Sequence, residues 1–166
     1  AYAGFYEADN KDGIKSSLAV TTRTGSGKFD FPSNLQSGSI IIGTGLNATT
    51  MKEANVKITS NASFEGYADG GSFCGTAVSY RIYFVAEFDV EASSVGTWNG
   101  NDLKKGNKVE NKPGTGVYFT FDTKGGKTVK YKVGVSYVSL ANAKQNLEAE
   151  NPNWDFEKIK EEAVVA

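Results

Sequence analysis

A change of hydrophobic period near the C-terminus constrains the fold of this chain more than any other feature. Over residues 129–137 apolar and polar side chains alternate, which predicts a β-strand with one apolar face and one solvated face. Leu140, Ala143 and Leu147 then recur at helical spacing, which predicts an amphipathic helix. The strand runs directly into the helix, so the apolar side of the helix needs a sheet to lie on.

A second short helix is predicted after the first one. Asn151 and Pro152 end the first helix, because proline disfavours a helical residue before it. Asp155 is a good N-cap for the next helix. We therefore expect two helices within residues 139–166, after a sheet-forming part over residues 1–138.

The rest of the chain predicts strands separated by turn residues. The expected strands lie at 14–21, 29–31, 40–42, 56–58, 64–69, 82–90, 94–98 and 117–121. We expect residues 23–28 (RTGSGK) to form a tight hairpin turn, and the isoleucine run 40–42 to be a strand covered on both faces. The longest apolar strand, 82–90, is expected to be central. The fold class is therefore mainly β, an antiparallel β-sandwich followed by two short helices.

Composition excludes several classes of function. The 166 residues suit one domain and include no histidine and a single cysteine, so an intramolecular disulfide and every histidine-based catalytic scheme are excluded. The net charge of -1 gives no attraction for nucleic acid or for an anionic membrane. No apolar run approaches the ~20 residues of a membrane span.

The sequence GSGK at residues 25–28 invites comparison with a phosphate-binding loop. The full motif needs a glycine at position 22, where Thr22 stands, and a serine or threonine where Phe29 stands. Phosphate-binding loops also join a strand to a helix, whereas strands are expected on both sides of this segment. We interpret it as a turn.

Carboxylate pairs carry out glycoside hydrolysis, and Glu87 and Asp89 are the best-placed candidates in the chain. Both project from the same face of one predicted strand, because side chains two residues apart point the same way. They cannot approach a glycosidic bond from opposite sides. We therefore predict no catalytic residue and no metal ligand in this chain.

Two features are candidates for substrate binding or for a domain interface. The first is the glycine-rich loop after residue 69, where the candidates are Gly70, Gly71, Phe73, Cys74 and Gly75. Its glycines permit close approach of the backbone to a ligand or another surface, although Phe73 and Cys74 equally suit a loop that tucks into the core. The second is Trp98, whose ring suits either stacking on a sugar or packing at the rim of the sheet.

Four separated segments carry a resemblance to one enzyme family. These segments are 13–32 (GIKSSLAVTTRTGSGKFDFP), 70–75 (GGSFCG), 80–89 (YRIYFVAEFD) and 133–156, which leads into the helices. Together with the opening residues they resemble the N-terminal β-sandwich domain of the bacterial family 92 glycoside hydrolases, the exo-acting α-mannosidases. The resemblance spans nearly the whole chain and is weakest around 99–115.

The resemblance implies a part of a two-domain enzyme. Residues 1–138 would be the later part of a supersandwich-like domain, and residues 139–166 a helical linker toward a catalytic domain. In the family that second domain supplies the general acid, the general base and most ligands of an essential calcium ion, so no cofactor is expected in this chain. The implied partners are the catalytic domain and a mannose-containing glycan, with no nucleic acid and no membrane span.

The implied location is secreted, periplasmic or on the surface of a bacterial cell. The resemblance also implies that the chain alone is inactive. Two other functions stay open from the residues themselves. One is a free-standing carbohydrate-binding sandwich, for which Trp98 is the clearest aromatic candidate. The other is a structural interaction domain whose helices dock on a partner.

Overall fold

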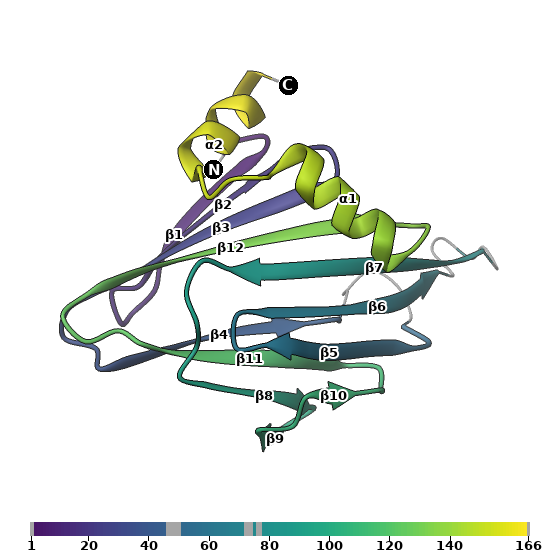
Figure 1. The fold of residues 1–166 in the computed structure, drawn as a ribbon, viewed down its shortest axis with the longest axis horizontal. Helices are drawn as coiled ribbons and strands as arrows, with labels where there is room; N and C mark the ends of the chain where they lie inside the picture. Colours follow the sequence, from purple (N-terminus) through teal and green to yellow (C-terminus); the bar gives the residue numbers. More distant parts are fainter. Residues whose placement is uncertain (1, 46–50, 72–74, 76–77, 166) are drawn as a thin grey trace.

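The chain forms a sandwich of two antiparallel sheets, with two helices on one outer face (Figure 1). The structure, a computed structural model, describes residues 2–45, 51–71, 75 and 78–165. Within this part the large sheet has eight strands, in the spatial order β1 (Phe5–Asp9), β2 (Lys15–Val20), β3 (Thr24–Phe31), β12 (Lys127–Ser136), β7 (Ser79–Phe88), β6 (Ser63–Gly71), β5 (Ala54–Ser60) and β10 (Val109–Glu110). The small sheet has four described strands, in the order β4 (Ser37–Gly43), β11 (Thr115–Asp122), β8 (Ser94–Asn99) and β9 (Asp102–Lys105).

Strand β12 lies in the interior of the large sheet, between β3 and β7. Val129 is fully buried, and Tyr131 and Val133 pack against the core on the same face of the strand. Burial raises the pKa of the Tyr131 hydroxyl. The predicted alternation is confirmed over residues 129–135, but the face expected to be solvated is not, because Lys132, Gly134 and Ser136 are buried on the side of β12 that the helices cover. The interior position predicted for 82–90 is confirmed, since most of this segment lies in β7.

Aromatic side chains from both sheets fill the space between them. Phe64 of β6 and Phe119 of β11 are fully buried, with their ring centroids 5.7 Å apart. The ring of Phe88 in β7 lies 4.8 Å from that of Phe119. Rings at these separations contribute packing beyond the area that they bury. The core of the sandwich therefore rests on aromatic side chains contributed by both sheets.

The two helices, α1 (Leu140–Glu150) and α2 (Phe156–Val165), cover part of the large sheet (Figure 1). Helix α1 begins after Ser139, whose hydroxyl accepts the N–H of Asn142 at 3.1 Å. The Asp155 carboxylate accepts the N–H of Lys158 at 3.1 Å, which confirms the N-cap predicted for the second helix. None of the described helices is long and apolar enough to cross a membrane.

Helix α1 lies unusually close to β12 because a glycine stands beneath it. A Cβ atom at Gly134 would come within 2.7 Å of the Cβ of Leu147. Leu147 and Ala143 are both buried against the sheet, as their helical spacing predicted. The sandwich and the helices are therefore joined by close packing as well as by the chain itself.

Two further local predictions are wrong. Residues 24–31 form strand β3, so the GSGK sequence lies inside a strand and not in a turn. Gly25 and Gly27 stand opposite Val133 and Tyr131 of β12, and this pairing overrides the local preference of glycine for turns. The turn lies just before, where Thr21 donates its N–H to the carbonyl of Thr24 at 2.9 Å.

The isoleucine run 40–42 was expected to be covered on both faces and is not. It lies in β4, which is an edge strand of the small sheet. Ile40 is buried, but the side chain of Ile41 is 64% exposed. A continuous apolar run fits a strand that is buried on both faces, but it does not tell which neighbours are present.

Candidate functional site

The predicted glycine loop lies at one end of the sandwich, which we call the loop end. Here β6 ends at Gly71, β7 begins at Ser79 and β12 ends at Ser136 (Figure 1, right-hand side). Gly70 and Gly71 are the last residues of β6, and Gly75 lies in the connection to β7. Phe73 and Cys74 lie outside the described residues.

The glycines of this end are explained by contacts within the chain or by their backbone conformation. A Cβ atom at Gly70 would lie 2.9 Å from the ring of Tyr80, which stands directly opposite in β7. Gly71 and Gly75 have φ values of +144° and +77°, and residues with a Cβ atom rarely adopt such values. The surface that Gly70 approaches is therefore Tyr80 of its own chain.

Exposed apolar side chains gather beside these glycines. The rings of Tyr80 and Tyr137 meet edge to face, with their centroids 6.0 Å apart. Tyr137 and Val138 are 71% and 74% exposed, and Val78 just before β7 is exposed as well. A cavity of about 420 Å³ lies next to them, lined by Thr22, Arg23, Ile82, Val135, Ser136, Tyr137, Val138, Asn142 and Asn146. We call the group Val78, Tyr80, Tyr137 and Val138 the loop-end patch.

An arginine clamps the two strands that carry the loop. Arg81 of β7 binds both carboxylate oxygens of Asp69 in β6, at 2.5 Å and 2.8 Å, and its guanidinium lies 3.9 Å from the ring centroid of Tyr67. Glu53 accepts a further hydrogen bond from Arg81 at 3.1 Å. The hydrogen bonds from Arg81 hold the pKa of Asp69 below its ordinary range. This bidentate pair fixes the register of β6 and β7 next to the loop.

Trp98 lies in the other sheet, on the outer face of β8. Its ring reaches across the neighbouring strands, because Cβ atoms at Gly116 of β11 and Gly43 of β4 would stand 2.6 Å and 3.0 Å from ring carbons. The side chain is partly exposed, and its Nε1 is buried without a hydrogen-bond partner among the described residues. The flat ring suits stacking, but the structure does not bring it together with Gly70 and Gly71.

A second ring lies on the same outer face. Tyr118 of β11 covers Gly96 of β8, where a Cβ atom would be 2.6 Å from the tyrosine hydroxyl. Each ring thus sits on a glycine of a neighbouring strand, an arrangement that protects the glycine backbone. Both the packing and the stacking interpretations of Trp98 are compatible with this geometry.

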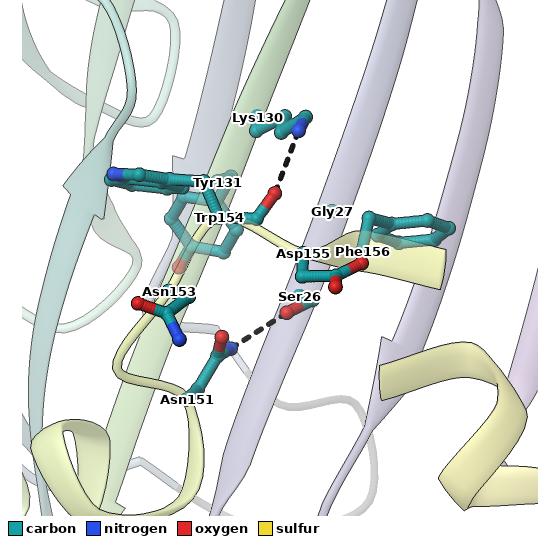
Figure 2. A pocket seen from close by; sticks show the side chains of 9 residues that line it. All are labelled: Ser26, Gly27, Lys130, Tyr131, Asn151, Asn153, Trp154, Asp155 and Phe156. Atoms are coloured by element: carbon teal, nitrogen blue, oxygen red, sulfur yellow. Dashed lines mark hydrogen bonds between the residues drawn. The ribbon is translucent and has the colours of Figure 1, made fainter. Parts of the chain in front are cut away.

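The connection between α1 and α2 is fastened to the sheet by polar contacts (Figure 2). Asn151, almost fully buried, donates its side-chain N–H to the hydroxyl of Ser26 at 2.7 Å, and Lys130 donates to the carbonyl of Trp154 at 2.6 Å. Lys132 places its ammonium 4.5 Å from the Trp154 ring centroid. The crevice here measures only about 10 Å³, roughly the space of one water molecule. It is a packing seam and not a ligand site.

The two carboxylates considered for catalysis have structural partners. Glu87 lies 3.4 Å from the ammonium of Lys132, and Asp89 accepts the backbone N–H of Lys130 at 2.8 Å. Neither forms an acid–base pair with another carboxylate in a described contact. Among the described residues, no group of three or more Asp, Glu, Cys or His side chains gathers that would suit a metal ion.

Reasoning from the sequence missed the loop-end patch and the arginine clamp. A usable signal for the clamp was Arg81, a charged residue inside the apolar strand sequence YRIYFVAEF. A charge in such a strand needs a partner, and Asp69 lies at the end of the strand predicted just before the loop. Tyr137 had been assigned to an inward face, but β12 ends one residue earlier.

Comparison with protein families gives one match that covers most of the chain. Residues 1–136 match the glycosyl hydrolase family 92 N-terminal domain. A curated relative, described as an uncharacterized secreted glycosidase from the fungus Arthroderma benhamiae, is 26% identical over 184 residues, which is 100% of this chain and 24% of that protein. The chain therefore spans about a quarter of the length of this relative.

Solved structures share the fold. The family GH92 α-mannosidase BT3965 from Bacteroides thetaiotaomicron superposes with a TM-score of 0.82 and 19% identity, over 96% of this chain and 22% of that chain. The family GH92 inverting mannosidase BT2199 from the same organism gives a TM-score of 0.83 and 20% identity, over 97% of this chain and 21% of that chain. At these identities the likeness establishes the fold.

Proposed function

Since this chain belongs to glycosyl hydrolase family 92, through the N-terminal domain of that family, we propose that it is the non-catalytic sandwich part of an exo-acting α-mannosidase. The family match over residues 1–136 is the observation that carries the proposal. In this proposal residues 1–138 form the later part of the sandwich, and residues 139–166 are the linker to a catalytic domain. The substrate of the whole enzyme is a mannose-containing glycan.

The proposed role of the chain is to shape the active site from its loop end. The loop-end patch leaves Tyr137 and Val138 mostly exposed, as a surface that packs against another domain would. The clamp between Arg81 and Asp69 keeps the strands behind this surface in register. Helix α1 begins beside the patch, so the linker leaves the sandwich where we place the catalytic domain.

Catalytic groups and calcium belong to the proposed catalytic domain. Glu87 and Asp89 are held by lysine and backbone groups, and the described residues offer no cluster suited to calcium. We therefore assign no step of hydrolysis to this chain. The proposed location is outside the cytoplasm, by analogy with the secreted relative.

Release of mannose by the purified chain tests the proposal. We expect no turnover on any α-mannoside with added calcium, and activity from the full-length gene product under the same conditions. Inverting hydrolysis needs an acid and a base about 6.5–9.5 Å apart on opposite sides of the bond. Calcium-dependent release by residues 1–166 that disappears in Glu87→Gln would contradict the assignment.

The role of the loop end is tested separately in the full-length gene product. Tyr137→Ser should lower kcat/KM for an α-mannoside, whereas Leu103→Ser, a control at a 70% exposed leucine of β9, should not. Cys74 is the single cysteine of the chain and serves as a probe. We expect slower thiol labelling in the full-length protein than in residues 1–166, and equal rates would count against an interface at the loop end.

A free-standing carbohydrate-binding sandwich is the second candidate function. The flat, partly exposed ring of Trp98 favours it, with Tyr118 on the same face. Affinity electrophoresis of residues 1–166 in mannan gels distinguishes this function from the non-catalytic sandwich part of an enzyme. A carbohydrate-binding module should migrate more slowly in the presence of mannan, and the Trp98→Ala variant should not. The third candidate, docking of the helices on a partner, is less favoured because α1 and α2 already bury their apolar sides on the large sheet.

A further inference from the structure

The side of the large sheet that the helices cover is polar. Residues that pair across neighbouring strands point to the same side of a sheet, so Thr24 lies beneath α1 together with its partner Gly134. On the opposite side of β12, Val129 and Tyr131 pack in the core of the sandwich. The buried side chains that β3 and β12 turn toward the helices are polar, and they belong to Thr24, Ser26, Lys132 and Ser136. This interface therefore differs in kind from the core between the two sheets.

The helices meet this polar surface with buried amide side chains. Asn146 of α1 is buried and donates its side-chain N–H to the carbonyl of Val135 at 2.8 Å. Asn151, which ends α1, is buried as well and donates to the Ser26 hydroxyl. Water replaces both partners when the helices leave the sheet. Such hydrogen bonds give the docked helices a defined position, but they contribute little net stability.

A buried ammonium group opposes docking. The side chain of Lys132 is only 10% exposed, and its Nζ lies 3.4 Å from Oε2 of Glu87. The same Nζ lies 3.4 Å and 3.5 Å from the carbonyl oxygens of Asn151 and Pro152. These distances are long for hydrogen bonds, so the contacts only partly replace the water that an ammonium loses on burial. Lys132 regains this water when the helices leave the sheet.

The apolar contacts of α2 are separate from the core of the sandwich. Phe156 and Ile159 pack with Ala19 of β2 and with Phe5 of β1 in a cluster of their own. Among the described residues, the cluster between the two sheets contains side chains of strands and loops and none of α1 or α2. The core between the sheets therefore stays covered when the helices leave.

The chain can bend between β12 and α1 without loss of sheet pairing. Residues 137–139 separate the end of β12 from the start of α1, and the side chains of Tyr137 and Val138 are mostly exposed. Strand β12 pairs with β3 on one side and with β7 on the other. Its place in the sheet therefore does not depend on the helices.

We propose that residues 140–165, which we call the helical strap, release from the large sheet as one unit while both sheets stay folded. The polar contacts and the burial of Lys132 make docking weak, and the close contact of Leu147 with Gly134 makes it specific. In the proposed enzyme the strap is the linker, and release would free the sandwich to turn relative to the catalytic domain. This consequence rests on the proposed function, whereas the release itself is a property of the chain.

Amide hydrogen exchange in the purified chain, residues 1–166, tests the proposal at single residues. The reporter amides are those of Leu147 in α1 and Lys160 in α2. The reference amides are those of Val133 in β12 and Phe119 in β11. After correction for intrinsic rates, the two reporters should exchange equally fast, and at least about 100-fold faster than the references.

Low concentrations of urea distinguish release from fraying of the helix ends. Release exposes the whole contact surface of the strap, so the exchange of Leu147 and Lys160 should accelerate with one shared dependence on urea. Fraying exposes little surface and depends hardly at all on urea. A shared slope that is smaller than the slope of Val133 therefore identifies release of one unit from a folded sandwich.

Val117→Ala separates release from global unfolding. Val117 is fully buried in the core of the sandwich, and the helices pack on other strands. The variant destabilises the sandwich, so Val133 should exchange about 10-fold faster or more. Leu147 and Lys160 should keep their rates, because release of the strap leaves the core intact.

Asn151→Ala tests the strap itself. The variant removes the hydrogen bond to Ser26, so Leu147 and Lys160 should both exchange about 10-fold faster. Asn153→Ala is the matched control, at an exposed residue of the same connection, and it should change neither rate.

Two kinds of result would overturn the proposal. Reporter rates equal to the reference rates, or a Val117→Ala effect of equal size at reporters and references, would show that the helices leave only when the whole chain unfolds. An Asn151→Ala effect confined to Leu147, or different urea slopes at Leu147 and Lys160, would show that the two helices open separately.

Discussion

Arg23 and Glu150, 127 residues apart in the sequence, fasten the end of α1 to the turn between β2 and β3. The Arg23 Nε donates to one carboxylate oxygen of Glu150 at 2.5 Å, and the Arg23 backbone N–H and the Thr21 hydroxyl donate to the other at 2.9 Å and 2.5 Å. A carboxylate is unfavourable at a helix C-terminus, where the helix dipole is negative. The three donors offset this cost and tie the end of α1 to the turn between β2 and β3.

This contact predicts a stability that depends on pH. Burial alone would raise the pKa of Glu150, but the hydrogen bonds from Thr21 and Arg23 outweigh it and hold the pKa below its ordinary value of 4.5. A depressed pKa in the folded state stabilises the fold above the unfolded-state pKa, and this contribution is lost as the pH falls below about 4.5 through the folded-state pKa. Glu150→Gln should therefore lower the free energy of unfolding by about 1–2 kcal/mol at pH 7 and by much less at pH 3.

Urea unfolding at both pH values measures this difference. Glu148→Gln is the matched control, because Glu148 lies in the same helix, is 64% exposed and only approaches Lys144 at 3.9 Å. It should change the free energy of unfolding by less than about 0.5 kcal/mol. A Glu150→Gln effect of equal size at pH 3 and pH 7 would show that its charge is not what stabilises the turn.

The close packing of α1 on β12 predicts that Gly134→Ala is destabilising. The added methyl group would meet the Cβ of Leu147 at 2.7 Å, so the helix must shift away from the sheet. We expect a loss of about 1–3 kcal/mol in chemical denaturation. Gly45→Ala is the control, since no described residue other than its chain neighbour comes within 4 Å of the added Cβ, and it should be nearly neutral. Equal stabilities of the two variants would contradict the packing described for α1.

The core aromatic residues predict a large effect of truncation. Phe119 is fully buried between the rings of Phe64 and Phe88, so Phe119→Ala should cost about 3–5 kcal/mol through loss of contacts and formation of a cavity. Leu103→Ala, at an exposed edge position, should cost less than about 0.5 kcal/mol. Thermal unfolding of both variants measures the contrast, and a cost below about 1 kcal/mol at Phe119 would place the core elsewhere.

The arginine clamp predicts a local effect more than a global one. Asp69→Asn leaves Arg81 with weaker partners, but both side chains are partly exposed, so the free energy of unfolding should fall by less than about 1 kcal/mol. The amides of Gly70 and Tyr80, at the ends of β6 and β7, should exchange faster. Unchanged exchange at these two amides would show that the clamp does not hold the loop end in register.

Predictions from the sequence succeeded where the structural cause is local. The alternation over residues 129–135 reflects the pleat of β12, and Asp155 caps α2 through a contact three residues away. The prediction of a turn at GSGK failed because its glycines are held in β3 by pairing with β12, about 100 residues later in the chain. The prediction that the isoleucines of β4 are covered on both faces failed because a side-chain pattern does not show whether a neighbouring strand is present.

The candidate site was also predicted only in part. Gly70 and Gly71 were identified because a high density of glycine is visible in the sequence. The sequence does not show why glycine is needed at position 70, which is that the ring of Tyr80 in the paired strand leaves no room for a side chain. The loop-end patch was missed because the exposure of Tyr137 depends on where β12 ends and on what covers the sheet there. Such facts arise from the tertiary structure and have no signature in a short stretch of sequence.

The interior position of β12 also sets an order of events during synthesis. The large sheet is completed only when residues 127–136 insert between β3 and β7 and pair with both. At translation rates of about 5–20 residues per second, roughly 5–20 s separate the emergence of Phe31 from that of Lys127. For that time β3 has an unpaired side, which is the kind of edge on which strands of other chains can pair.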